Sequence, residues 1–234
     1  MARAGQDGPP SKPVARGGPL RVRRGFLQTA VDAAKDEIMA AEPPQMAPGD
    51  AVLVVDVQRD FCPGGALAVP EGDQVVGVLN EWMGAATHAG ALIVASRDWH
   101  PANHVSFVQR GGPWPPHCVQ ESVGAQLHPE LKLPPDGYLL SKGQEPDRDA
   151  YSAFDGTGLE VWLRERDVRR LFVGGLAQDI CVRATVLDGL RLGFETHVLC
   201  HATRPVDSEA GEQALRDMRA AGAILQEAPP ARSG

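Results

Sequence analysis

The sequence predicts an α/β fold in which a largely parallel sheet of about six strands carries helices on both faces. Short apolar runs of strand length alternate along the chain with longer segments in which apolar residues recur at helical spacing. The strand runs are continuously apolar, as expected for strands that are covered on both faces. This alternation indicates βαβ units and therefore a parallel sheet. At 234 residues the chain is long enough for one such domain with a single core.

Each element is expected from its apolar pattern and from the residues that end it. The first strand, at 51–55 (AVLVV), ends at Asp56. Gly90 and Gly193 end two of the helical patterns. The irregular stretch from about 96 to 135 holds much of the proline, tryptophan and histidine, and a loop of that length in a compact domain is usually functional. The other strands are expected at 91–95, 138–140, 171–173, 196–200 and 223–225, and the helices at 73–89, 158–166, 182–193 and 207–221.

The two ends of the chain are expected to lie outside this domain. Residues 1–24 are rich in glycine, proline, alanine and arginine, so they cannot bury enough apolar surface to become ordered. A helix is expected at 26–41, because Pro43-Pro44 ends its apolar pattern. The sequence therefore divides into an N-terminal extension at 1–49, with a mobile tail and then a helix, a folded domain at 50–228 and a C-terminal tail at 229–234.

Composition narrows the classes of partner. The net charge of −7 argues against nucleic acid or an anionic membrane, because either would need a basic face, and no apolar run approaches the roughly 18 residues of a membrane span. The four cysteines are few for this length and suit thiols in a reducing compartment. Arg23-Arg24 resembles an export signal, but Asp32, Lys35 and Asp36 follow it, so we expect a cytoplasmic protein. An export role for Arg23-Arg24 and assembly into a homo-oligomer stay open.

One cysteine is expected at the start of a helix. Gly174-Gly175 breaks the apolar run 171–173, and a helical pattern begins soon after Cys181. Asp179 is placed to be the N-cap or an early acidic residue of that helix, so the thiol would lie in the field of the unpaired N–H groups of the first turn. Such a field favours the thiolate, which is the nucleophilic form. The alternative is a buried apolar cysteine that begins a core helix.

Three further strands end at charged residues. Asp56, Asp98 and Lys142 each follow a predicted strand, as Cys181 does, and ligands bind outside the carboxyl ends of the strands in such sheets. A single charged strand end is merely solvated in most proteins, but four can converge in one crevice. These residue types suit amide hydrolysis, in which Cys181 attacks a carbonyl, Asp56 moves the proton and Lys142 stabilises the charged forms. Backbone N–H groups at the turn before Cys181 would supply the oxyanion site.

A second cluster of side chains has the composition of a metal site. Asp98 and His100 form a D-x-H pair, and His104 and His117 follow in the same irregular stretch. One carboxylate and three imidazoles suit a divalent transition metal with open positions for water or substrate. The alternative is a proline-rich surface loop with scattered histidines, which binds no metal.

With both clusters in place, the chain resembles the nicotinamidase branch of the isochorismatase-like cysteine hydrolases over about residues 50–225. The motifs that carry the resemblance are AVLVVDVQRDFCPGGALAV, SRDWHPANHVSF, WPPHCV, SKG, AYSAF and VGGLAQDICVRATVLDGLRLG. The resemblance implies a three-layer, Rossmann-like sheet of six parallel strands. It also implies hydrolysis of nicotinamide to nicotinate and ammonia in NAD salvage through a cysteine thioester, action on pyrazinamide, and one divalent metal ion, which could be Zn, Fe or Mn.

The resemblance also implies roles for individual residues. The catalytic triad would be Asp56, Lys142 and Cys181, and the metal ligands would be Asp98, His100, His104 and His117. The aromatic clamp for the pyridine ring would be Phe61 and Trp114, with Tyr151 nearby. A cis peptide would join Leu176 and Ala177, and the N–H groups of Ala177 and Cys181 would be the oxyanion donors. Gln178-Asp179-Ile180 stands where many bacterial members have Thr-Asp and then Tyr or His, which leaves fine specificity open.

Three alternatives to a nicotinamidase stay open. The same fold and triad could act on another small amide, such as a carbamoyl or ureido compound, although relatives of that kind generally lack the metal cluster. The isochorismate-cleaving type lacks the nucleophilic cysteine, so Cys181 counts against it. A catalytically idle metal- or pyridine-binding protein would carry the same residues, and only a turnover assay separates it from an enzyme.

Overall fold

The structure is a computed structural model that describes residues 45–227 of the chain. Most of the predicted N-terminal extension, including the helix expected at 26–41, lies outside the described residues, as does the tail expected at 229–234. The two predicted boundaries of the folded domain therefore stay predictions.

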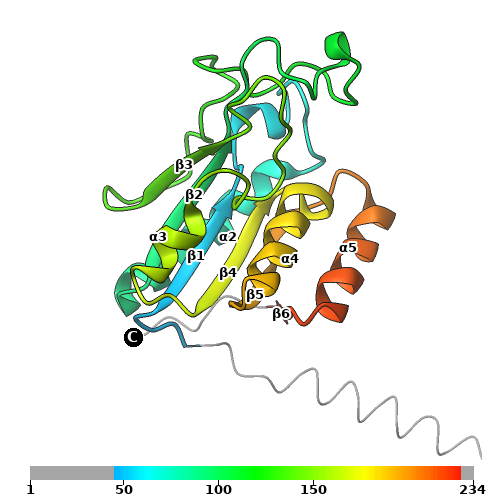
Figure 1. Cartoon of the computed structure of the whole chain (residues 1–234). Coiled ribbons are helices and arrows are strands. Elements are labelled where there is room, and N and C mark those ends of the chain that lie inside the picture. Colours follow the sequence, from blue (N-terminus) through cyan, green and yellow to red (C-terminus); the bar gives the residue numbers. More distant parts are fainter. Residues whose placement is uncertain (1–44, 228–234) are drawn as a thin grey trace, which may run out of the picture. The chain divides into compact units, whose positions relative to one another are not determined.

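The described part of the chain folds around a six-stranded sheet with the strand order β3-β2-β1-β4-β5-β6 (Figure 1). Every neighbouring pair of strands in it is parallel, which confirms the predicted α/β fold class. Strands β2 and β3 follow β1 on one side of the sheet, and β4, β5 and β6 then follow on its other side. The switch point of the topology therefore lies between β1 and β4. The strands are β1 (Asp50–Val55), β2 (Leu92–Asp98), β3 (Tyr138–Lys142), β4 (Arg170–Leu176), β5 (Glu195–Arg204) and β6 (Ile224–Gln226).

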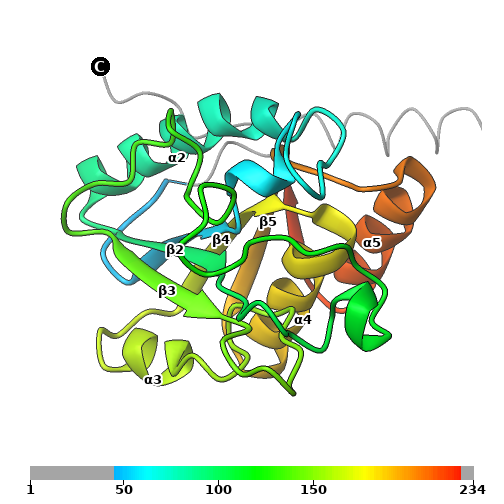
Figure 2. The same ribbon diagram turned by 90° about the horizontal axis from the view of Figure 1, so that it is seen from above.

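Helices cover both faces of this sheet, as the sequence predicts (Figure 2). Helix α2 (Val75–Ala89) packs on one face, and α3 (Leu159–Arg164), α4 (Arg183–Arg191) and α5 (Ser208–Ala220) lie on the other. Gly90 ends α2 in a left-handed conformation, in which its N–H group bonds the last carbonyls of the helix. None of the helices within residues 45–227 is long and apolar enough to cross a membrane.

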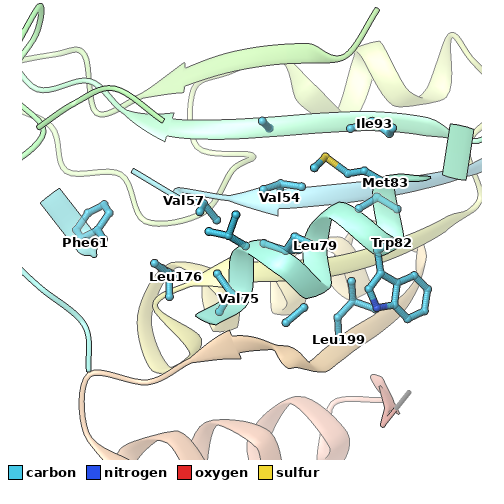
Figure 3. Close-up of a cluster of buried hydrophobic side chains, with 14 of the residues drawn as sticks. Val54, Val57, Phe61, Val75, Leu79, Trp82, Met83, Ile93, Leu176 and Leu199 are labelled. Carbon is cyan, nitrogen blue, oxygen red and sulfur yellow. The ribbon is translucent and has the colours of Figure 1, made fainter. Parts of the chain in front are cut away.

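The core consists of two apolar layers that share the central strand β1. Val52 and Val54 face α2, whereas Leu53 and Val55 face the layer of α3, α4 and α5. This alternation follows from the two-residue period of a strand, and it explains why β1 is apolar at every position from 51 to 55. Figure 3 shows the α2 layer, where Leu79 and other side chains of the helix pack on the sheet. Burial of a side chain of this size stabilises the fold by roughly 1.5–3 kcal/mol.

The predicted break at Gly174-Gly175 is wrong, because β4 runs through both glycines to Leu176. Gly175 has a φ of 124°, and a Cβ atom there would lie against the backbone of Val55 on the neighbouring strand. Glycine is therefore needed for the close approach of β4 to β1, not to end the strand. A register shift between Val173 and Gly175 accompanies this approach on the β5 side.

Candidate active site and metal-binding cluster

Four predicted site residues come together at the carboxyl edge of the sheet. Asp56 follows β1, Asp98 ends β2, Lys142 ends β3, and Cys181 lies in the π-helical turn η4 (Gln178–Val182) that follows β4. Because β1 lies between β2 and β4, this place is the switch point of the sheet, where open α/β folds bind their ligands.

Lys142 connects the candidate nucleophile to both carboxylates. Its Nζ atom lies 3.0 Å from Oδ2 of Asp56, 2.5 Å from Oδ1 of Asp98 and 3.5 Å from Sγ of Cys181. The Lys142 side chain is 0% exposed, and it also donates a hydrogen bond to the carbonyl of Ala150 at 3.2 Å. A buried ammonium with these partners stays charged and can stabilise negative charge on the sulfur.

The charges of this group set the pKa of each member. Burial alone would lower the pKa of Lys142, but the carboxylates of Asp56 and Asp98 outweigh it and raise that pKa well above the usual value. Burial raises the pKa of Asp56 to about 6, although Lys142 acts in the opposite direction. Burial would also raise the pKa of Asp98, but Lys142 and His100 lower it below the usual value. Asp56 is therefore the carboxyl group that can take up and release a proton near neutral pH.

The surroundings of Cys181 oppose ionisation of its thiol. Burial raises its pKa well above the usual value, and the negative charges of Asp56 and Asp98 add to this effect while Lys142 opposes it. Burial and the two carboxylates thus act against the effect predicted for the helix start, and the prediction that this start favours the thiolate stays a prediction. Asp56 can accept the thiol proton during attack, because one of its oxygens lies within 4.8 Å of Sγ.

The backbone around Asp56 and Cys181 has two unusual features. Asp56 has a φ of 49°, in the left-handed region that non-glycine residues rarely adopt, and Ser96 donates a hydrogen bond to its Oδ1 at 2.7 Å. The peptide bond between Leu176 and Ala177 is cis, at the position that the family resemblance implies.

Asp179 does not cap the helix that carries Cys181. The π-helical turn begins after Ala177 without a side-chain cap, and Asp179 is an acidic residue of its first turn, which was the second of the two predicted roles. Its carboxylate accepts hydrogen bonds from the N–H groups of Val206 at 3.0 Å and Asp207 at 3.4 Å. Asp179 thereby fixes the loop before α5, whose Val206 lines the cavity described below.

Asp98, His100 and His117 form the candidate metal site. All three are buried, and one ligand atom from each lies within 4.8 Å of the others. Nδ1 of His100 lies 2.9 Å from the carbonyl of Gly143, and Nδ1 of His117 lies 2.8 Å from that of Pro115. A carbonyl only accepts, so in each neutral ring Nδ1 carries the proton and Nε2 keeps a lone pair for a metal. The donor set therefore fits a divalent transition metal.

His104 lies beside this group, but its nitrogens have other partners. Its ring stacks on that of His100 with 4.1 Å between the centroids. Its Nε2 lies 3.0 Å from the carbonyl of Arg148, and its Nδ1 lies 2.7 Å from the hydroxyl of Ser106. His104 must give up one of these bonds to bind a metal, and its role as a ligand stays a prediction.

The candidate nucleophile and the candidate metal site open into one cavity. Its empty volume is about 470 Å³, which includes part of the open mouth. Phe61, Trp114 and Tyr151, the three predicted ring-binding residues, all line it, and the indole N–H of Trp114 donates to the hydroxyl of Tyr151 at 3.2 Å. Phe61 also lies at one end of the apolar layer in Figure 3, so the core supports the cavity wall.

Sequence reasoning missed the apolar wall of the cavity and one buried amide. Ile180 and Val206 line the cavity together with Leu67 and Val69, and only the departure at Ile180 gave a signal. The amide of Gln58 donates to the carbonyl of Asp98 at 2.7 Å and accepts its N–H at 2.8 Å. The sequence signal that could have indicated a role for Gln58 was its position two residues after Asp56.

A parallel α/β sheet that presents a buried cysteine, lysine and aspartate at its switch point has the architecture of a cysteine-dependent hydrolase. The chain belongs to the isochorismatase family, because the isochorismatase domain matches residues 50–229.

The chain is similar to several known enzymes, two of them in solved structures with a bound ion or product. The nicotinamidase of Escherichia coli (strain K12) is 43% identical over 201 residues, which cover 76% of this chain and 94% of that protein. The pyrazinamidase of Pyrococcus horikoshii in complex with zinc is 49% identical, with a TM-score of 0.75, over 77% of this chain and 100% of that one. PnC1 from L. infantum in complex with nicotinate is 37% identical, with a TM-score of 0.71, over 80% of this chain and 95% of that one.

Proposed function

We propose that this protein is a metal-dependent nicotinamidase, which hydrolyses nicotinamide to nicotinate and ammonia and also accepts pyrazinamide. One observation carries the proposal: Lys142 joins Asp56 to Asp98 and Cys181, and the last two line one aromatic-walled cavity together with the histidine cluster. The similarity to a nicotinamidase and to a nicotinate complex supports this choice of substrate.

In the first half of the reaction, Cys181 would form a thioester with the substrate. Its Sγ attacks the carboxamide carbon while the thiol proton passes to Asp56, and Lys142 stabilises the developing negative charge on sulfur. The carbonyl oxygen becomes an oxyanion, for which the N–H groups of Ala177 and Cys181, two residues that line the cavity, are the proposed donors. Asp56 then gives the proton to the nitrogen as the C–N bond breaks, and ammonia leaves.

In the second half, water would release the acid. Asp56, again a carboxylate, takes a proton from the water that attacks the thioester carbon. The C–S bond then breaks, the sulfur recovers its proton from Asp56, and the acid becomes nicotinate when its carboxyl proton passes to solvent. A pKa of about 6 suits Asp56 to both roles, because a group that accepts and returns a proton works best when its pKa lies near the working pH.

Asp98, His100 and His117, together with His104, are the proposed ligands of one divalent ion, with zinc, iron and manganese as candidates. The zinc in the Pyrococcus relative supports zinc in particular. A bound ion would supply an electrophilic position for the nitrogen of a pyridine ring. Phe61 and Trp114 would hold the faces of that ring, and Tyr151 orients Trp114 through the hydrogen bond to its indole N–H.

The main alternative is a hydrolase of another small amide, such as a carbamoyl or ureido compound. The experiment compares ammonia release by the purified protein from nicotinamide and from carbamoyl and ureido compounds of similar size. We expect the highest kcat/KM with nicotinamide. Turnover of the carbamoyl or ureido compounds without turnover of nicotinamide would favour the alternative, and turnover of none would favour an idle binding protein.

We also propose that the enzyme works in the cytoplasm. Cys62, Cys118, Cys181 and Cys200 all lie in the described part of the chain, and all four are free thiols. Free thiols are typical of a reducing compartment, which supports this location.

A further inference from the structure

His117 is followed by a residue in a strained backbone conformation. Cys118 has a φ of 45°, in the left-handed region, and it is 0% exposed. A non-glycine residue in that region is strained and persists only where the surrounding structure imposes it. The direction in which His117 enters the candidate metal site therefore depends on contacts that hold the Cys118 peptide.

Asp60 holds the N–H group of Cys118, whereas the carbonyl of Cys118 accepts the N–H of His100 at 3.0 Å. Oδ2 of Asp60 accepts the N–H of Cys118 at 2.7 Å, across 58 positions of sequence. Its Oδ1 accepts the N–H of Ala66 at 3.2 Å, and its own N–H donates to the carbonyl of Gly124 at 3.0 Å. A Cβ atom on Gly124 would lie against the Asp60 carboxylate, so the carboxylate is also enclosed from that side.

Asp60 does not line the cavity that holds Cys181 and the candidate metal ligands. It precedes Phe61 in the short helical turn η1 (Arg59–Phe61), so the segment that carries one aromatic wall also fixes the loop of His117. Asp60 therefore acts on the site through the backbone that it holds, and its charge also reaches the ring of His117.

We propose that Asp60 is a positioning residue for the metal site, which holds His117 in place through its hydrogen bond to the Cys118 peptide. The inference rests on the metal site of the proposed function. Partners that orient a metal ligand from behind typically change metal affinity about 10- to 100-fold when they are removed. Asp60 is therefore expected to set zinc affinity without contacting zinc or substrate.

The test measures the zinc dissociation constant of full-length protein by competition with a chromophoric chelator. Asp60→Ala should weaken zinc binding about 10- to 100-fold. Asp60→Asn keeps one acceptor oxygen for the Cys118 N–H and should restore most of the affinity. The matched control is Asp155→Ala, because Asp155 is also a half-buried carboxylate that accepts two backbone N–H groups, those of Tyr151 at 3.0 Å and Ser152 at 2.9 Å. This control should bind zinc as the wild type does.

Two results would overturn the inference. The first is zinc affinity in Asp60→Ala within about threefold of the wild type, which lies below the range expected for such a partner. The second is an equal loss in Asp155→Ala. Thermal unfolding of the zinc-free proteins shows whether Asp60→Ala folds, and if it does not, Asp60→Asn decides: near-wild-type affinity supports the hydrogen bond, and a full loss contradicts it. Failure of the proposed function would look different, since the wild type itself would then bind no zinc or release no ammonia from nicotinamide.

Discussion

Protonation of Asp56 should lower kcat/KM as the pH falls through about 6. Its pKa is raised from 3.8 to about 6, chiefly by burial, and the proposed reaction needs the carboxylate to accept the thiol proton. About nine-tenths of a group with that pKa is ionised at pH 7 and about one-tenth at pH 5. The expected result is a fall in kcat/KM of about tenfold between pH 7 and pH 5.

The assay is the initial rate of ammonia release from nicotinamide across this pH range at several zinc concentrations. If the fall in kcat/KM at low pH, the acid limb of the profile, came from protons competing with zinc at the histidine ligands, its midpoint would shift to lower pH as the zinc concentration rises. A limb caused by protonation of Asp56 would keep its midpoint. Asp56→Asn should lose about 10²–10⁴-fold in kcat/KM and should lack this limb. Asparagine tolerates the left-handed φ of 49° at this position, so the variant should fold.

The same pKa shift predicts a change in stability. A carboxyl with a raised pKa in the folded state contributes stability that is present below its unfolded pKa, near 4, and is lost as the pH rises through about 6. A shift of about two units corresponds to roughly 3 kcal/mol. The unfolding free energies of zinc-free wild type and zinc-free Asp56→Asn are compared at both ends of this range. From pH 7 to pH 4 the wild type should gain stability relative to Asp56→Asn, by up to that amount. Flat activity through pH 5, or a pH-independent difference in stability, would refute the reasoning.

The remaining predictions concern the nucleophile, the metal and the ring. Cys181→Ala should abolish ammonia release while zinc affinity stays unchanged, and Cys200→Ala should keep most of the activity; near-wild-type turnover by Cys181→Ala would disprove the covalent route. His104→Ala and His117→Ala should each weaken zinc binding in a chelator titration and severely reduce hydrolysis. Exhaustive chelation of the wild type should reduce hydrolysis in the same way. Full activity in protein shown to be metal-free would contradict the metal requirement. Benzamide, which has the carboxamide but no ring nitrogen, should show a far lower kcat/KM than nicotinamide, and equal values would show that no contact to the ring nitrogen contributes.

The fold could be predicted from the sequence because its central strands contain runs that are apolar on both faces. The run 51–55 matches β1 within one residue, since every side chain of that strand is buried. Strand ends were less well predicted: β2 continues to Asp98, through polar residues that an apolar pattern cannot include. The backbone ladder to β3 holds those residues, and it pairs Asp98 with Lys142. Gly175 was misjudged because its role depends on the neighbouring Val55, which no local pattern reveals.

The meeting of the site residues could be predicted because topology brings the carboxyl ends of parallel strands together. Asp56, Asp98, Lys142 and Cys181 needed only this rule. The protonation state of the thiol could not be predicted, because it depends on how deeply the sulfur is buried and on charges from three other strands.

The contacts that position the site were also out of reach of the sequence. Gln58 meets Asp98 across 40 positions, and Asp60 meets Cys118 across 58. Such pairs follow from the packing of loops, for which the sequence has no periodic signal. The predicted roles of the ring-binding residues and of His104 await experiment.

A single-turnover reaction tests the central claim most directly. Excess full-length enzyme is mixed with nicotinamide, quenched with acid at successive times and digested, and the peptide that contains Cys181 is analysed by mass spectrometry. The account predicts that a nicotinoyl group appears on Cys181 and disappears as nicotinate forms. Formation of nicotinate while this peptide stays unmodified at every time, with Cys181→Ala equally active, would contradict it.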